Sequence, residues 1–387
     1  MEEWKEYKLG EITNMKNGKK RPQNNGVFPV YGGNGIMDYS DSYNAENAII
    51  VGRVGAYCGC VYKCESKCWV SDNAISIFAK DIADTQFLYY LMTTLDFHHH
   101  HIGGAQPLMT QDIIGDFTVS IPPLAIQHQI IQILKSLDDK IEVNKRINDN
   151  LELQAQALYK SWFVDFEPFK DGKFVDSELG MIPEGWSIGD IGTYSKVRSG
   201  FAFKSSWWTQ SGSKVIKIKN ITSDYRLDMT ECSFVSKDNT AKASEFRVEV
   251  GDLLIAMTGA TIGKFCLITS SDNNTYVNQR VGKFFLGNEP LKRLPFLYCC
   301  LKQDSVINEI INKGQGSAQP NISGTDIESI KIVLPNDETI PIFNEHLYPM
   351  YKMIIKNQEE IELLSTMRDS ILPKLMSGEL KVNDLNN

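Results

Sequence analysis

Long apolar runs are absent from the sequence. No run approaches the roughly 18 residues that a transmembrane helix needs, so we expect no membrane-spanning segment and no membrane partner. The first stretch, MEEWKEYKLGEI, is charged and lacks the apolar core of a signal peptide, which predicts a cytoplasmic protein. The eight cysteines do not form the dense frame of a small secreted domain, which favours reduced thiols over disulfides.

Signatures of catalysis are also missing. No G-x-G-x-x-G follows a strand pattern, and the stretch GATIGKF is one residue short of a P-loop between Gly259 and Gly263. Phe265 stands where a P-loop has the Ser or Thr that binds Mg²⁺. Pro122-Pro123-Leu124 lacks the flanking Asp or Asn and the aromatic residue of an amino-methyltransferase motif. We therefore expect a non-catalytic chain, with no catalytic residue, no metal site and no cofactor of its own.

An excess of positive charge is lacking as well, because 40 Lys+Arg stand against 48 Asp+Glu and the net charge is −8. The placement of charge matters more for nucleic-acid binding than its sum. Between Pro183 and Pro335, 18 basic residues accompany 15 acidic ones. Basic runs occur at KNGKKR (16–21) and KVIKIKN (214–220). This distribution is compatible with DNA binding through local patches.

A long heptad pattern without Gly or Pro occupies residues 126–166. Its seam residues recur at alternating steps of three and four, which predicts one helix of about 60 Å. Such a helix needs a partner helix to bury its seam in water. The predicted seam residues are Leu134, Leu137, Ile141, Asn144, Asn148, Leu151, Ala155, Leu158 and Trp162.

A second heptad pattern runs from Leu347 to Leu375, within the segment 337–387. We predict that the two helices pair antiparallel within the chain, although each could instead pack on its own domain. Asn144 and Asn357 both lie in mid-seam, where a polar residue costs stability but fixes the register, so we expect them to pin the alignment. The seam residues of the second helix are Leu347, Met350, Ile354, Asn357, Ile361, Leu364, Arg368, Ile371 and Leu375.

The globular segments that precede the two helices repeat each other. NAIIVGRVGAYCGCV parallels GDLLIAMTGATIGKFCL, with Gly55 and Gly59 matching Gly259 and Gly263. WVSDNAISIF parallels YVNQRVGKFF, and Ala-Gln-Pro occurs in both copies. Matched segments in the same order indicate an internal duplication.

The repeat predicts an α+β fold with two globular α/β domains, separated by two long antiparallel helices that form a coiled-coil spacer. The pseudo-two-fold repeat is suited to two separated half-sites on duplex DNA, and the half-sites should differ because the domains differ. The predicted segments are a first domain at 1–125, a spacer helix at 126–166, a linker at 167–182, a second domain at 183–336 and a second spacer helix at 337–387.

The chain resembles the specificity (S) subunits of type I restriction–modification systems. The resemblance rests on PEGW (183–186), DLLIAMTGATIGK (252–264), AQPLMTQDIIGDFTVSIPPLAIQHQI (105–130), LYKSWFVDFEP (158–168) and ILPKLMSGEL (371–380). It covers nearly the whole chain. The first copy departs from the family pattern at Arg53-Val54-Gly55, where a Thr-Gly-Ala-type turn is usual, and at Ile126-Gln127-His128-Gln129, where a Glu-Gln pair is more frequent.

The resemblance implies a role in DNA recognition within a larger complex. Each recognition domain would read one half of a bipartite site on double-stranded DNA. Two methyltransferase (M) subunits, which bind S-adenosylmethionine and methylate adenine N6, would dock on the spacer helices. Restriction (R) subunits, which use ATP and Mg²⁺, would join them.

Sequence readout requires Arg, Lys, Asn and Gln at base edges and positive or small residues at phosphates. In the first domain the candidate DNA-binding residues are Lys19, Lys20, Arg21, Asn34, Arg53, Asn73 and Gln106. In the second they are Arg198, Lys204, Lys217, Lys219, Lys264, Asn278, Arg280, Gln319 and Asn321.

Two alternatives belong to other classes of protein. A stand-alone zinc enzyme or nuclease would use Cys58, Cys60, Cys64 and Cys68, or Glu65-Ser66-Lys67 as half of a nuclease motif, although the cysteine spacing matches no usual zinc motif. A scaffold without DNA function would present two domains on a coiled coil. The run His98–His101 could bind metal or phosphate, but a solvated helix end is the simpler interpretation.

Overall fold

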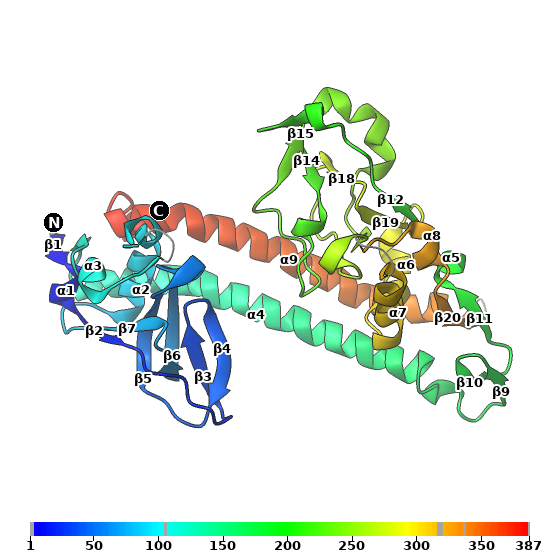
Figure 1. Cartoon of the computed structure of the whole chain (residues 1–387), viewed down its shortest axis with the longest axis horizontal. Coiled ribbons are helices and arrows are strands. Elements are labelled where there is room, and N and C mark those ends of the chain that lie inside the picture. Colours follow the sequence, from blue (N-terminus) through cyan, green and yellow to red (C-terminus); the bar gives the residue numbers. More distant parts are fainter. Residues whose placement is uncertain (1–3, 104–106, 316–319, 336–337, 386–387) are drawn as a thin grey trace. The chain divides into compact units, whose positions relative to one another are not determined.

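The computed structural model describes residues 4–103, 107–315, 320–335 and 338–385 (Figure 1). The chain divides into two compact units: unit 1 comprises Met1–Ile141 and Leu363–Asn387, and unit 2 comprises Glu142–Glu362. Both units combine sheets with helices, and the two long helices α4 (Leu124–Phe163) and α9 (Thr339–Ser377) contribute a part to each. The predicted α+β fold class with two long helices is confirmed.

Unit 1 is built on a six-stranded sheet of order β2-β7-β5-β6-β3-β4. Neighbouring strands are antiparallel except β3 and β6, which are parallel (Figure 1). Strand β1 pairs with β8 in a separate antiparallel ribbon. The strands are β1 (Lys5–Lys8), β2 (Thr13–Asn17), β3 (Phe28–Gly32), β4 (Gly35–Ser40), β5 (Ala45–Gly52), β6 (Val61–Val70), β7 (Ala74–Ala79) and β8 (Thr118–Ile121). The short helices are α1 (Leu9–Ile12), η1 (Gly55–Tyr57), α2 (Thr85–Thr93), η2 (Phe97–His100) and α3 (Gln111–Gly115).

The core of unit 1 joins these elements to both long helices. Asp84 caps α2 by accepting hydrogen bonds from the amides of Gln86 and Phe87, which stabilises the first turn. The buried cluster beneath α2 contains Leu134 from α4 and Leu375 from α9. Each globular segment buries side chains of both helices. Unit 1 therefore includes the predicted segment 1–125 together with the first part of the predicted segment 126–166.

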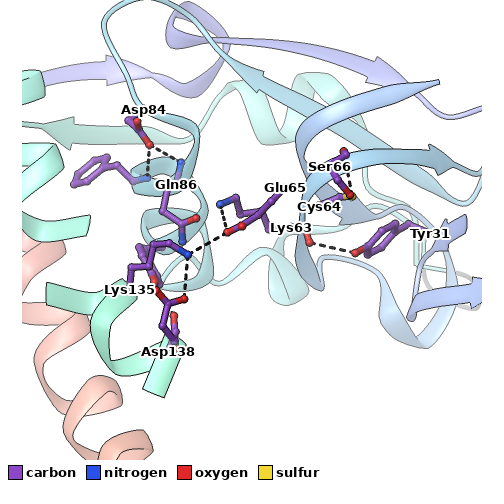
Figure 2. Close-up of polar contacts among 12 residues, drawn as sticks. Tyr31, Lys63, Cys64, Glu65, Ser66, Asp84, Gln86, Lys135 and Asp138 are labelled. Atoms are coloured by element: carbon purple, nitrogen blue, oxygen red, sulfur yellow. Dashed lines mark hydrogen bonds and ion pairs between the residues drawn. The ribbon is translucent and has the colours of Figure 1, made fainter. Parts of the chain in front are cut away.

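Polar contacts add to this packing in unit 1. The Tyr90 hydroxyl donates to Asp138 Oδ2 at 2.6 Å, and Arg368 Nη1 donates to Asp138 Oδ1 at 2.8 Å. On the sheet side, Lys135 forms an ion pair with the carboxylate of Glu65 at 3.6 Å. Figure 2 shows the two side chains pointing toward each other. One segment of α4 therefore contacts helix α2, strand β6 and helix α9.

Unit 2 follows the same chain order but splits its strands into smaller sheets. A four-stranded sheet has the order β12-β19-β16-β17 and another the order β13-β15-β14-β18, while β9–β10 and β11–β20 form antiparallel ribbons. The strands are β9 (Phe174–Ser177), β10 (Gly180–Pro183), β11 (Ser187–Asp190), β12 (Lys196–Ser199), β13 (Trp208–Thr209), β14 (Ser213–Ile216), β15 (Ser233–Val235), β16 (Leu253–Ala256), β17 (Phe265–Leu267), β18 (Thr275–Val277), β19 (Val281–Phe285) and β20 (Lys331–Leu334).

Helices complete unit 2, and its main buried cluster includes Phe296 of α6 together with Phe343 and Tyr351 of α9. The Phe296 amide donates to Asn344 Oδ1 at 2.8 Å, which ties the two helices together. The helices are α5 (Ile191–Tyr194), α6 (Pro290–Leu301), α7 (Asp304–Gly314) and α8 (Gly324–Glu328). Shorter turns of helix are η3 (Glu167–Phe169), η4 (Ser205–Trp207), η5 (Ile218–Asn220), η6 (Lys237–Asn239), η7 (Ala241–Phe246) and η8 (Gly259–Thr261), and η9 (Val382–Leu385) follows α9 in unit 1.

Within unit 2 the long helices run antiparallel, because Asn148 contacts Asn357 while Tyr159, further along α4, contacts Phe343, earlier in α9. The predicted helix at 126–166 differs at its end. Helix α4 stops at Phe163, and Phe166 adopts a left-handed conformation with φ +54°. The predicted seam residues are buried at Leu134, Ile141, Asn144, Ile354 and Ile361 and half-buried at Leu137, Leu151, Leu158, Asn357, Leu364 and Ile371.

Asn144 and Asn357, which we expect to pin the alignment, each form a hydrogen bond across the helix pair, but with other residues than each other. Asn357 Nδ2 donates to Asn148 Oδ1 at 2.8 Å, and Asn144 Nδ2 donates to Glu360 Oε2 at 2.8 Å. Asn148 also donates to the carbonyl of Ile354 at 3.2 Å. The heptad period determines which face each residue occupies but not the offset along the partner helix, so it could not identify Asn148, one half-heptad after Asn144, as the partner of Asn357.

Across the ranges that the structure describes, no helix combines the length and apolar character that crossing a lipid bilayer requires.

We predict that Asn148 and Asn357 are energetically coupled. Asn148→Leu alone leaves the Asn357 amide without its partner and should lower the free energy of unfolding by about 1 kcal/mol, whereas Asn148→Leu with Asn357→Leu should restore it. Urea unfolding of the single and double variants measures the coupling. The exposed Asn150→Leu on the same helix serves as the control and should change stability by less than about 0.5 kcal/mol. Additive losses in the double variant would show that the pair is not coupled.

Candidate nucleic-acid interface

In unit 1, strand β5 ends in a tight glycine-rich turn. Gly55 and Gly59 have φ of +74° and +85°, in the left-handed region that favours glycine. The Cys58 amide donates to the Gly55 carbonyl at 3.0 Å, and the Gly59 amide donates to the Gly52 carbonyl at 2.9 Å. The turn therefore folds back on the end of its own strand.

Other loops of unit 1 are attached to this turn by backbone hydrogen bonds. The Arg53 amide donates to the Asn73 carbonyl and the Met109 amide to the Arg53 carbonyl, both at 2.8 Å. The Gly55 amide donates to the Pro107 carbonyl at 3.1 Å. The end of β2 joins through the Lys19 amide, which donates to the Val70 carbonyl at 3.0 Å.

Unit 2 repeats this arrangement bond for bond. The corresponding backbone hydrogen bonds have lengths of 2.9 to 3.2 Å. Named with the donor amide first and the acceptor carbonyl second, they are Ile262 to Gly259, Gly263 to Ala256, Met257 to Arg280, Ile322 to Met257, Gly259 to Pro320 and Phe201 to Val277. We call each set of loops a loop frame: residues 18–19, 53–59, 71–73 and 107–109 in unit 1, and 200–201, 257–263, 278–280 and 320–322 in unit 2. The duplication that the sequence indicates is therefore present in the backbone.

Candidate residues of unit 1 gather at its loop frame. Lys19, Arg53 and Asn73 belong to it, and Asn34 follows Gly33, where an added Cβ would lie 3.6 Å from the Asn73 carbonyl oxygen. Lys20 and Arg21 continue from Lys19 and are exposed, and Arg21 forms an ion pair with Asp38 at 3.0 Å. Gln106 lies outside the described residues.

In unit 2, Arg280 and Asn321 line a hollow of about 720 Å³ at the loop frame. Asn278 is buried, and its Oδ1 accepts from the Arg280 amide at 3.4 Å, so its side chain holds the turn. Lys264 is half-buried, and its carbonyl accepts from the Ala256 amide. Gln319 lies outside the described residues.

The remaining basic candidates of unit 2 are engaged with neighbouring side chains. Arg198 forms an ion pair with Glu245, and Lys219 pairs with Glu231 at 3.1 Å. The Lys217 ammonium lies 3.6 Å from the centre of the Trp208 ring, a cation–π contact. Partial burial, together with nearby Lys219, lowers the pKa of Lys217 below its ordinary value.

Lys204 lies 5.5 Å from the centre of the Trp207 ring. Three polar residues that the sequence patterns did not indicate, Ser199, Thr258 and Gln279, line the same hollow as Arg280. Gln279 is exposed and adjacent to Arg280, so its position in the duplicated motif YVNQRVGKFF was the signal that could have identified it.

The cysteines and histidines of unit 1 are packed in the core or paired with neighbouring residues. Among the described residues, no group of three or more His, Cys, Asp or Glu is arranged to hold a metal ion. Cys58, Cys64 and Cys68 are buried in the core. A hydrogen bond from Cys68 lowers the pKa of the Cys64 thiol. His99 contacts the carboxylate of Asp96 at 2.7 Å, close to the end of η2.

Glu65 and Lys67, which the nuclease alternative uses together, contact different side chains. Glu65 pairs with Lys63 at 3.0 Å and with Lys135 (Figure 2), and the two lysines lower the pKa of its carboxyl group. The Lys67 ammonium lies 4.5 Å from the centre of the Tyr43 ring.

The sequence and the fold of this chain are similar to those of known proteins. The family described as "type I restriction modification DNA specificity domain" matches residues 1–153 and 183–366. The type I restriction enzyme MjaIX specificity subunit of Methanocaldococcus jannaschii is 27% identical, over 80% of this chain and 72% of that protein. The HindI specificity subunit of Haemophilus influenzae is 24% identical, over 72% of each. The crystal structure of an S subunit from M. genitalium shares the fold with a TM-score of 0.63 at 17% identity, over 97% of this chain and 96% of that one.

We predict that the two glycines of the unit 2 turn tolerate alanine differently. At Gly259 (φ +67°) an added Cβ meets nothing within 4 Å, so Gly259→Ala should cost only the backbone strain, about 1 kcal/mol. At Gly263 (φ +85°) the Cβ would lie 3.1 Å from Ile307 Cδ1, so Gly263→Ala should cost more.

Chemical denaturation measures both losses. Gly287→Ala is the matched control, because Gly287 has φ +87° and an open Cβ position outside the loop frame, and it should resemble Gly259→Ala. Equal losses at Gly259 and Gly263 would show that packing against α7 does not constrain the turn.

Proposed function

This chain belongs to the type I restriction modification DNA specificity family, and on that premise we propose that it is the DNA-specificity subunit of a type I restriction–modification complex. It reads a bipartite, asymmetric sequence in double-stranded DNA, with one half-site for each unit. The observation that carries the proposal is the loop frame, which occurs once in each unit with the same backbone bonds and different side chains. One backbone with two sets of side chains suits two unlike half-sites.

The charge of the loop frames supports DNA binding although the whole chain carries −8. Lys19, Lys20 and Arg53 lie at or beside the frame of unit 1, and Arg280 lies in that of unit 2. Positive side chains contact phosphates, and exposed Arg and Asn side chains can read base edges. The acidic residues elsewhere limit non-specific adhesion to the polyanion.

The catalytic work belongs to partner subunits in this proposal. Two M subunits, carrying S-adenosylmethionine, methylate adenine N6, and R subunits use ATP and Mg²⁺ to translocate and cut DNA in the cytoplasm. Apolar side chains exposed on α4 within unit 2 offer a docking surface for an M subunit. They are Val143, Ile147 and Leu153.

The proposal predicts the methylation pattern of a host that expresses this chain with its M partner. Methylome sequencing should show one motif made of two unlike half-sites around a fixed gap, and the motif should be absent when this chain is omitted. A scaffold without DNA function would leave the methylome unchanged. Identical methylation with and without this chain would contradict the proposal.

The length of the long helices predicts the gap between the half-sites. Removing one heptad from α4 and the facing heptad from α9 shortens the helices by about 10.5 Å, so the recognised gap should shrink by roughly three base pairs at about 3.4 Å each. Methylome sequencing measures the gap. Replacing the same heptads with others of equal length is the control and should keep it. An unchanged gap in the shortened protein would refute the idea that helix length determines spacing.

A further inference from the structure

The two loop frames carry different side chains at one equivalent backbone position. The Arg53 amide donates to the Asn73 carbonyl, and the Met257 amide donates in the same way to the Arg280 carbonyl, so Asn73 and Arg280 occupy equivalent backbone positions. Their preceding neighbours are Asp72 and Gln279. Unit 1 thus presents Asp-Asn at the position where unit 2 presents Gln-Arg.

The position of Arg280 is a concave site with hydrogen-bonding capacity. The hollow of about 720 Å³ is lined by the polar residues Arg280, Gln279, Asn321, Ser199 and Thr258 together with small and apolar residues. Among the described residues that line it, none carries a carboxylate. A DNA edge entering this hollow would meet neutral amides and one guanidinium, without acidic repulsion.

The Arg280 guanidinium differs from most other arginines of unit 2. Within the described part of the chain, no carboxylate or carbonyl accepts a hydrogen bond or ion pair from it. Four other arginines of the unit have protein partners: Arg198 with Glu245, Arg226 with Asp149, Arg247 with Glu249 and Arg293 with the Tyr194 carbonyl. With respect to the described residues its donors are available to an external ligand, while the backbone around it is held by the loop frame.

We infer that Arg280 reads a guanine in the half-site bound by unit 2, and that Asn73 reads the equivalent position in the half-site bound by unit 1. The inference rests on the proposed function. A guanidinium forms two parallel hydrogen bonds with N7 and O6 of guanine, whereas an Asn amide suits N7 and N6 of adenine. The exchange of Arg for Asn on one backbone frame therefore makes the two half-sites unlike at this position.

A phosphate contact is the rival role for Arg280. Phosphate contacts fix the position of the protein and give no sequence information, whereas base edges are read by hydrogen-bonding side chains held in position. The amide of Arg280 is held by Asn278, and the side chains of Gln279 and Asn321 share the hollow. These features favour the base edge.

The test is methylome sequencing of hosts that express the M partner with the wild-type chain, Arg280→Asn or Arg280→Gln. Both variants should keep the gap and the half-site of unit 1, while one guanine of the other half-site loses its requirement, with discrimination falling by about 10- to 100-fold. Because Gln pairs well with adenine, Arg280→Gln should favour adenine there. Arg247→Asn removes an exposed arginine that is paired with Glu249 and should leave the motif unchanged.

Each other outcome has a definite meaning. Unchanged motifs in both Arg280 variants would overturn the inference, as would uniformly weaker methylation of the wild-type motif, because that result identifies a phosphate contact. Thermal melting of the purified complexes separates a variant that misfolds from one that folds but misreads the site. The reciprocal variant Asn73→Ala should relax one position of the half-site bound by unit 1, which independently tests the equivalence of Asn73 and Arg280. Absence of any motif with the wild-type chain would instead refute the proposed function.

Discussion

Each compact unit depends on burying apolar side chains from helices that belong to distant parts of the sequence. Leu134 and Leu375 enter one buried cluster of unit 1, and Tyr159, Phe343 and Tyr351 enter the main cluster of unit 2. Neither globular segment has a complete core without these helix faces. A helix of this length, in turn, is stable in water only because its seam is covered. The sheets and the helices therefore stabilise each other.

The loop frames show how a duplicated backbone can acquire two specificities. Positive φ at Gly55 and Gly259, together with backbone hydrogen bonds, holds the loops without using most side chains. Substitution of Asn73 or Arg280 then leaves the hydrogen bonds of the frame intact. This separation lets the reading residues diverge while the fold persists, because the backbone groups are satisfied by the backbone itself.

Periodicity and repetition predicted the fold and the location of the candidate site. The heptad period identified both long helices, and the matched glycines located the turns that became the loop frames. The period could not determine the axial offset, so Asn148 rather than Asn144 is the partner of Asn357. It also could not reveal which cations are already paired, because the partner of Arg198, Glu245, is distant in sequence and adjacent only after folding.

The division of the chain has a consequence for its synthesis. Unit 2 is a continuous stretch, Glu142–Glu362, whereas unit 1 needs Leu375 and Met376 to fill the core that residues 1–141 begin. As the chain leaves the ribosome, unit 2 can fold as soon as its own segment is complete, while unit 1 must wait with apolar surface uncovered. Contacts between residues so far apart in sequence form slowly, because a long loop has to close first. The first unit to be translated is therefore the last to finish folding.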